Sequence, residues 1–134
     1  MATAQTTERR EFLADVFTTA IESGSYGWFT VEEYVHDGAE PYAVLVADDD
    51  HESYRVTLAT LSHGIGTLQR AELRPINDTE SVLHNAKTGQ RLFVSEANRR
   101  RMLAASRVND AGDVDVIDAL ALLEIGLFGA VTYA

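Results

Sequence analysis

The sequence predicts an α+β fold, in which a small antiparallel sheet packs against three to four helices. Three observations predict it: apolar residues at helical spacing in residues 7–23, β-branched and aromatic residues on both sides of a turn in residues 26–47, and an apolar helical stretch near the carboxyl end. A chain of 134 residues is long enough to bury one core. We therefore expect a single globular domain over residues 1–134, with the small polar residues 1–6 frayed.

The amino-terminal helix is predicted from a repeating apolar pattern. Phe12, Val16 and Ala20 recur every four residues, and Leu13, Phe17 and Ile21 repeat the same spacing one position later. Such a stripe covers one side of a helix and faces a core. Gly24 is a natural helix stop.

A β-hairpin is expected over about residues 26–47. The turn is predicted at Asp37-Gly38, and Pro41 precedes the second strand, YAVLVA. Further short strands are expected near residues 54–56 and 131–133. Strict alternation along the first strand gives two faces. Phe29, Val31 and Val35 belong to one face, and Trp28, Thr30 and Tyr34 belong to the other.

Two more helices follow from capping residues and apolar spacing, and a third, short helix is considered in the least clear stretch between them. Thr57 is a good N-cap, but Gly64 and Gly66 predict that the helix after it is short or distorted, or that a backbone packs closely there. A short helix is predicted over residues 79–86. Ser95 is a good N-cap for a helix that runs to about Val108.

The last helix follows a cluster of aspartates. The stretch NDAGDVDVIDALALLEIGLFG places four of them just before an apolar run: Asp110, Asp113, Asp115 and Asp118. A helix that begins at Asp115 uses that carboxylate as an N-cap and keeps Asp118 near the positive end of the helix dipole. The alternative, a calcium loop, needs glycine at its sixth position, where a loop starting at Asp113 has Asp118. We interpret the cluster as structural.

Composition excludes several classes of function. The chain has no cysteine, so disulfides, thiolate metal sites and cysteine nucleophiles are excluded, and a reducing cytoplasm fits best. The four histidines show no metal-binding spacing. We expect no metal, no cofactor and no membrane segment, and the absence of catalytic motifs argues against an enzyme. A net charge of −10 disfavours direct binding to DNA.

The charge is unevenly distributed, and this asymmetry suggests a binding surface. Residues 87–107 contain six basic residues and one acid, whereas residues 108–134 contain five acids and no lysine or arginine. Arginine forks grip phosphates and carboxylates well. The candidate ligand-binding residues are Arg91, Arg99, Arg100 and Arg101. The alternative pairs them with acids of the same chain or of a neighbouring subunit.

Two aromatic residues complete the candidate ligand site. Trp28 and Tyr34 share the second face of the predicted first strand, where they would line an interface or stack on a planar ligand. The alternative is that both belong to the core, since aromatic side chains are so often buried.

Three stretches of the chain, residues 11–34, 57–68 and 109–134, resemble small uncharacterised proteins encoded by actinobacterial phages, prophages and plasmids. They read EFLADVFTTAIESGSYGWFTVEEY, TLATLSHGIGTL and NDAGDVDVIDALALLEIGLFGAVTYA, and they cover about half of the chain. The resemblance implies an accessory protein of a mobile element in the cytoplasm of an actinobacterial host. It assigns no activity and no site residue.

The sequence therefore predicts a non-catalytic binding protein of a phage or mobile element that acts on a host factor. It would sequester a host protein or a nucleotide-like signal, for example in counter-defence. One alternative is an acidic mimic of nucleic acid that blocks a host DNA-binding enzyme. Another is a metal-dependent enzyme acting on phosphoesters through acids such as Asp48, Asp50, Asp113 or Asp115. Assembly into a homo-oligomer through the apolar carboxyl end is also considered.

Overall fold

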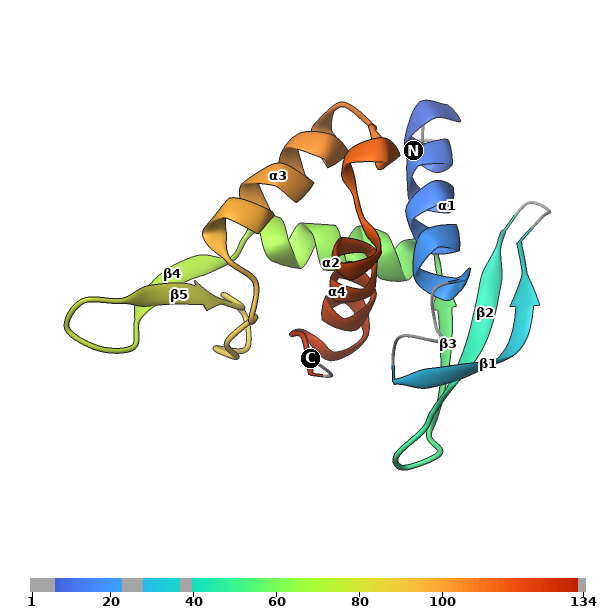
Figure 1. Cartoon of the computed structure of the whole chain (residues 1–134), viewed down its shortest axis with the longest axis horizontal. Coiled ribbons are helices and arrows are strands. Elements are labelled where there is room, and N and C mark those ends of the chain that lie inside the picture. Colours follow the sequence, from blue (N-terminus) through green and yellow to red (C-terminus); the bar gives the residue numbers. More distant parts are fainter. Residues whose placement is uncertain (1–6, 23–27, 37–39, 133–134) are drawn as a thin grey trace.

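Residues 7–22, 28–36 and 40–132 are described by the computed structural model, which confirms the α+β class (Figure 1). The helices in that part of the chain are α1 (Thr7–Glu22), α2 (Leu58–Gln69), α3 (Glu96–Arg107) and α4 (Val116–Phe128), with a 3-10 turn η2 (Ala111–Asp113) before α4. One antiparallel sheet has the order β1 (Phe29–Val35), β2 (Tyr42–Ala47), β3 (Ser53–Thr57). A second sheet pairs β4 (Glu72–Pro75) with β5 (Ser81–His84). The predictions for residues 1–6, for the stop at Gly24 and for the turn at Asp37-Gly38 lie outside the described residues.

The core lies where α4 packs against α1 and α2 (Figure 1). Two glycines let α2 and α4 approach closely. A Cβ atom on Gly64 would overlap the carbonyl oxygen of Leu122, and one on Gly126 would overlap the carbonyl oxygen of Thr60. Helix α2 runs for 12 residues, so the prediction of a short helix was wrong. The alternative, close packing of a backbone, is confirmed at Gly64.

The predicted faces of the first strand were wrong because β1 contains a bulge. The pairing with β2 shifts by one residue between Val31 and Glu33. A bulge inserts an extra residue and so exchanges the faces beyond it. Tyr34 consequently pairs with buried Ala43 on the inner face, together with Phe29 and Val31.

Two elements differ from the sequence expectation. The segment predicted as a helix over residues 79–86 contains strand β5, which pairs with β4 in register from Glu72–His84 to Pro75–Ser81. The β4–β5 hairpin projects from the body as an arm (Figure 1). The predicted closing strand at 131–133 does not form at Val131 or Thr132, although the Val131 amide donates to Leu92 O at 3.2 Å. Tyr133 lies outside the described residues.

The predicted helix starts are confirmed at Ser95 and Asp115. The Ser95 hydroxyl accepts from the Asn98 amide at 3.1 Å. Asp115 Oδ1 accepts from the Asp118 amide at 2.8 Å, and Asp118 Oδ2 accepts from the Asp115 amide at 3.3 Å. These reciprocal bonds form a capping box, so both carboxylates serve backbone amides at the start of α4.

Candidate functional site

Arg101 is held by the start of α4. Its guanidinium forms a two-pronged contact with the carboxylate of Asp118, in which Nη2 lies 2.9 Å from Oδ1 and Nη1 contacts Oδ2. Nη1 also donates to the Asp113 carbonyl at 3.0 Å. Asp118 is only 3% exposed, and its hydrogen bond raises the pKa of Arg101. Arg101 thus neutralises a buried acid of its own chain.

Arg99 is directed to the end of α2. Its Nε donates to Leu68 O at 3.0 Å and its Nη2 to Gln69 O at 3.1 Å, so it binds two carbonyls of the last helical turn. Its Nη1 also pairs with Glu96 at 3.1 Å. Arg100 shares Glu96, at 3.1 Å, but its side chain is 78% exposed. The intrachain pairing alternative therefore describes all three arginines, and Arg100 is the most exposed of them.

The other three candidates are scattered. The Arg91 guanidinium stacks over the ring of Phe93 at 4.7 Å. Tyr34 packs on Phe17 at 6.1 Å, and burial raises the pKa of its hydroxyl, opposed by a hydrogen bond with Thr18 and reinforced by one with Glu22.

Trp28 is 7% exposed and meets three aromatic rings at centroid distances of 5.0 to 5.9 Å: Phe29, Tyr54 and Phe128. Because so little of it is exposed, the ring of Trp28 belongs to the core. The six candidate residues do not come together in one site.

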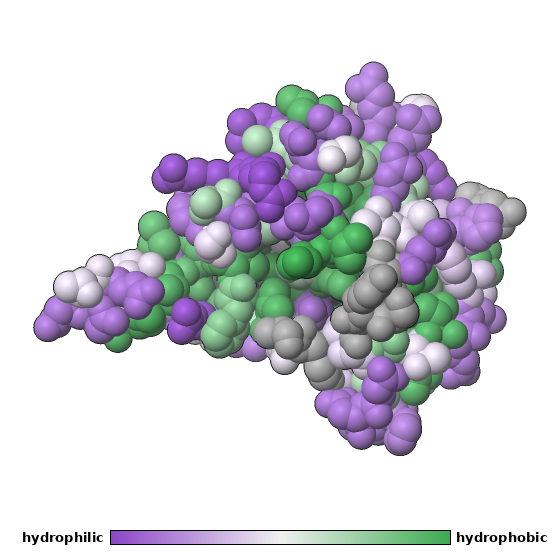
Figure 2. Space-filling view, in the orientation of Figure 1, coloured by the Kyte–Doolittle hydropathy of each residue, from purple (hydrophilic) through white to green (hydrophobic). Residues whose placement is uncertain are grey.

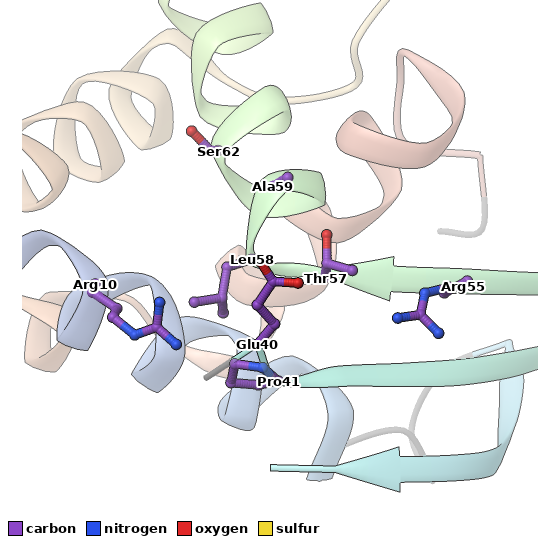
Figure 3. A pocket seen from close by; sticks show the side chains of 8 residues that line it. All are labelled: Arg10, Glu40, Pro41, Arg55, Thr57, Leu58, Ala59 and Ser62. Atoms are coloured by element: carbon purple, nitrogen blue, oxygen red, sulfur yellow. The ribbon is translucent and has the colours of Figure 1, made fainter. Parts of the chain in front are cut away.

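A surface hollow that the sequence did not indicate lies at the start of α2 (Figure 3). It has a volume of about 390 Å³. We call it the arginine hollow, because Arg10 from α1 and Arg55 from β3 stand on either side of it. The remaining lining residues are Glu40, Pro41, Thr57, Leu58, Ala59 and Ser62.

The electrostatics of the arginine hollow favour an anion. Its floor is the N-terminus of α2, where the amides of Leu58 and Ala59 have no partner within the helix, and no acidic residue occupies that first turn. Neither Arg10 nor Arg55 forms an ion pair among the described residues. Glu40 lies between the two arginines in Figure 3 and is the single carboxylate of the lining.

Local contacts hold the walls of the hollow in place. The Arg55 guanidinium stacks on the ring of Tyr42, with Cζ 4.0 Å from the ring centroid. The Thr57 amide donates to Thr60 Oγ1 at 3.1 Å and fixes the first turn of α2. One arginine is thus oriented by an aromatic ring, and the helix end between the arginines is ordered.

Neither a cluster of metal-ligating side chains nor a helix that could span a membrane is found in the described part of the chain. No three histidine, aspartate or glutamate side chains there are grouped so that they could hold a metal ion. Asp48 and Asp50 belong to the β2–β3 turn, far along the molecule from Asp113 and Asp115 at the start of α4 (Figure 1). No described helix has both the length and the apolar character needed to span a bilayer.

Fold and hollow together define a small α+β domain with a basic hollow on an acidic surface. No protein-family model, no curated protein and no solved structure matches the chain. Sequence reasoning missed the arginine hollow because its residues come from α1, β3 and the start of α2. The one local signal was Thr57 as an N-cap, which marks a helix N-terminus without saying what lies beside it.

Proposed function

We propose that the protein is a non-catalytic binding protein whose ligand is a nucleotide-like small molecule, with a phosphate group of the ligand in the arginine hollow. One observation carries the proposal: two arginines without ion-pair partners among the described residues flank the N-terminus of a 12-residue helix. Helix N-termini bind phosphates through free amides and the helix dipole, and arginine adds a matching fork of donors.

The dimensions and the remaining lining residues fit such a ligand. A volume of about 390 Å³ falls within the range of small-molecule pockets. The hydroxyls of Thr57 and Ser62 supply further hydrogen-bond donors, while Pro41, Leu58 and Ala59 supply apolar contact. The two arginines, which form no ion pair among the described residues, outnumber the single carboxylate of the lining, Glu40. They give the hollow a positive charge, on a chain of net charge −10, that favours an anionic ligand.

Binding without catalysis is supported by the residue types in the hollow. Its lining contains no histidine, lysine or tyrosine, and Glu40 is its only carboxylate. The resemblance to proteins of actinobacterial mobile elements supplies the setting. In that setting the protein would sequester a nucleotide-like signal of the host, a role suited to counter-defence.

Titration calorimetry with a panel of nucleotides of increasing phosphate number tests the proposal. Arg10→Gln and Arg55→Gln are each expected to weaken binding about tenfold, because each removes a charge-assisted contact. Arg107→Gln is the matched control, since that arginine is exposed, makes no ion pair among the described residues and lies outside the hollow. Equal affinity of all three variants, or no heat with any nucleotide, would contradict the proposal.

A second candidate, the acidic mimic of nucleic acid, is favoured by one feature of α1. Glu8, Glu11, Asp15 and Glu22 are all exposed and recur at helical spacing, so they form one acidic stripe along the helix. Such a stripe suits the basic groove of a DNA-binding enzyme. Immobilised protein should then capture such an enzyme at low salt and release it steeply as salt rises, and replacing Glu11 and Asp15 by amides should reduce capture. Retention that is insensitive to both changes would exclude the mimic.

A further inference from the structure

A second hollow lies at the other end of α2. Its volume is about 540 Å³, and it is formed by the last turns of α2, by the turn after β5 and by the end of α4. We call it the lysine hollow, after Lys87, the only lysine of the chain. The lining residues are His63, Thr67, Arg70, Asn85, Ala86, Lys87, Thr88, Phe128 and Gly129.

The lining of the lysine hollow contains bases and no acids. Arg70, Lys87 and His63 face it, whereas none of its nine lining residues is a carboxylate, although the chain has 21 acids and 11 lysines and arginines. Neither Arg70 nor Lys87 forms an ion pair among the described residues. Two cations that have no carboxylate partner in the described part of the chain thus stand at one hollow of an acidic protein, where an anion can pair with them.

Arg70 is accommodated by a glycine. Its guanidinium Nη1 lies 3.2 Å from the position that a Cβ atom on Gly66 would occupy. The guanidinium therefore lies back along the helix, over a residue that has no side chain. Glycine inside a helix is less favourable than alanine, and the close approach of Arg70 is the contact that this glycine makes possible.

Lys87 is placed by a buried amide. Asn85 is 6% exposed, and its Oδ1 accepts from the amides of Lys87 at 2.9 Å and Thr88 at 3.2 Å. Its Nδ2 donates to the carbonyl of Gly129 at 2.9 Å. One side chain thus orders the turn that bears Lys87 and attaches it to the end of α4. The backbone that carries Lys87 is fixed next to α2 before any ligand arrives.

We propose that the lysine hollow is a second ligand site that binds a phosphate group of a small molecule. Arg70 and Lys87 supply the charge, and the hydroxyl of Thr67 is a hydrogen-bond donor at the same hollow. The site is separate from the arginine hollow. From α2, Leu58, Ala59 and Ser62 line that hollow. His63 and Thr67 line this one, on a helix face about 100° away.

The competing role of the two cations is structural. The carboxyl ends of α2 and α4 both border the hollow, and cations stabilise helix carboxyl ends. A purely structural role predicts that removing Arg70 or Lys87 lowers the melting temperature and changes no anion-dependent signal. A ligand site predicts a loss of affinity that does not depend on any change in melting temperature.

The test is amide NMR of the full chain titrated with inorganic phosphate and, separately, with pyrophosphate. Phosphate-dependent shifts are expected at Gly66, Thr88 and Gly89, saturating with a single affinity. Arg70→Gln and Lys87→Gln should each weaken that affinity about tenfold. Arg107→Gln is the charge-matched control and should leave it unchanged.

The Arg55→Gln variant separates this proposal from the proposed function. It should raise the phosphate concentration needed for the shifts around Leu58 and Ala59 about tenfold while leaving the titration at Thr88 and Gly89 unchanged, so either hollow can fail alone. The proposal is overturned if phosphate moves none of these amides around the lysine hollow, or if Arg70→Gln and Lys87→Gln lower the melting temperature and leave the titration as in the wild type.

Discussion

At the scale of single residues, the buried carboxylate of Asp118 requires a positively charged partner. It is 3% exposed at the start of α4, and Arg101 is the cation that neutralises it. A buried carboxylate that loses its partner keeps its desolvation cost. Because the side chain of Arg101 is itself 39% exposed, water screens part of the interaction.

Arg101→Met is therefore expected to lower the free energy of unfolding by about 2 kcal/mol, measured by urea denaturation. Arg100→Met is the neighbouring control. Its side chain is 78% exposed, and we expect a change below about 0.5 kcal/mol. Equal effects of the two substitutions would show that the fork on Asp118 contributes little.

The carboxyl group of Glu96 makes the free energy of unfolding depend on pH. Burial acts to raise the pKa of its carboxyl, but hydrogen bonds from Arg99 and Arg100 outweigh burial, so the pKa lies below its ordinary value of 4.5. The unfolded state then binds the proton first as pH falls. The stabilisation by Glu96 is complete above pH 4.5 and is lost as pH falls through the lowered pKa.

Unfolding free energies of wild type and Glu96→Gln, measured by urea denaturation at a series of pH values, test this direction. The difference between the two proteins should be constant near neutral pH and should shrink as pH falls below 4.5. Glu80→Gln, at an exposed site that makes no ion pair among the described residues, should show a smaller difference throughout. A difference for Glu96→Gln that grows towards low pH would contradict the assignment.

The directions of the candidate arginines could be predicted from the sequence, but their partners could not. Consecutive helical residues point about 100° apart, which excludes one shared face for Arg99, Arg100 and Arg101, and they indeed contact α2, solvent and α4. Which arginine takes which partner depends on α2 and α4, distant in sequence. Arg10 and Arg55 have no local pattern at all, because only the packing of α1 beside β3 and α2 brings them to one hollow.

At the scale of elements, the contact of α2 with α4 depends on two glycines. Gly126→Ala and Gly64→Ala each gain helix propensity of up to about 1 kcal/mol, but each added methyl overlaps a backbone carbonyl of the facing helix. Backbone yields less easily than a side chain. We expect a net loss of about 2 kcal/mol for each substitution, measured by urea denaturation.

Gly66→Ala is the control within the same helix. The new methyl group meets the flexible guanidinium of Arg70 at 3.2 Å, and this guanidinium supplies its nearest contacts outside the helix backbone. Its propensity gain should therefore remain, as an increase of about 0.5–1 kcal/mol. If all three substitutions stabilise the protein, the close crossing of α2 and α4 is absent in solution.

The elements that the sequence predicted correctly are those with strong local signals. The apolar stripe of α1 and the run YAVLVA extend over enough residues for their period to be recognised. The caps Ser95 and Asp115 are recognised from their residue type at the start of an apolar pattern. Strand β5 has four residues, which are too few to show a period. It forms because it pairs with β4, and this pairing cannot be predicted from the four residues alone. The bulge in β1 escaped for the same reason: it is a property of the pairing with β2.

At the scale of the whole molecule, the surface is shaped by an excess of acids. The chain has 21 acids against 11 lysines and arginines, and hydrophilic residues gather over the β2–β3 turn and over α3 in Figure 2. Mutual repulsion among carboxylates opposes the compact state. Salt screens this repulsion, and it also screens attraction within ion pairs, so the sign of the net effect depends on which is larger.

We expect repulsion among the acids to outweigh attraction within the ion pairs. Four ion pairs are found among the described residues, and two of them are short-range contacts of Glu96 within α3, whereas acids outnumber lysines and arginines almost two to one. Raising the salt concentration from about 0.01 to 0.15 M shortens the screening length from about 30 to 8 Å. We expect the melting temperature to rise by roughly 3–5 °C over this range, equivalent to about 1 kcal/mol.

The acidic stripe of α1 provides the variant that tests this origin. Glu11→Gln combined with Asp15→Asn removes two exposed charges from the stripe, so the protein should melt higher at low salt and gain less from added salt than wild type. Calorimetry in sodium chloride measures both quantities. Chloride is preferred to phosphate as the added anion because both hollows are proposed to bind phosphate groups. A melting temperature that falls with salt would mean that the ion pairs of Arg101 and Glu96 outweigh the repulsion. The surface acids would then have to lie closer to positive charge than the present structure places them.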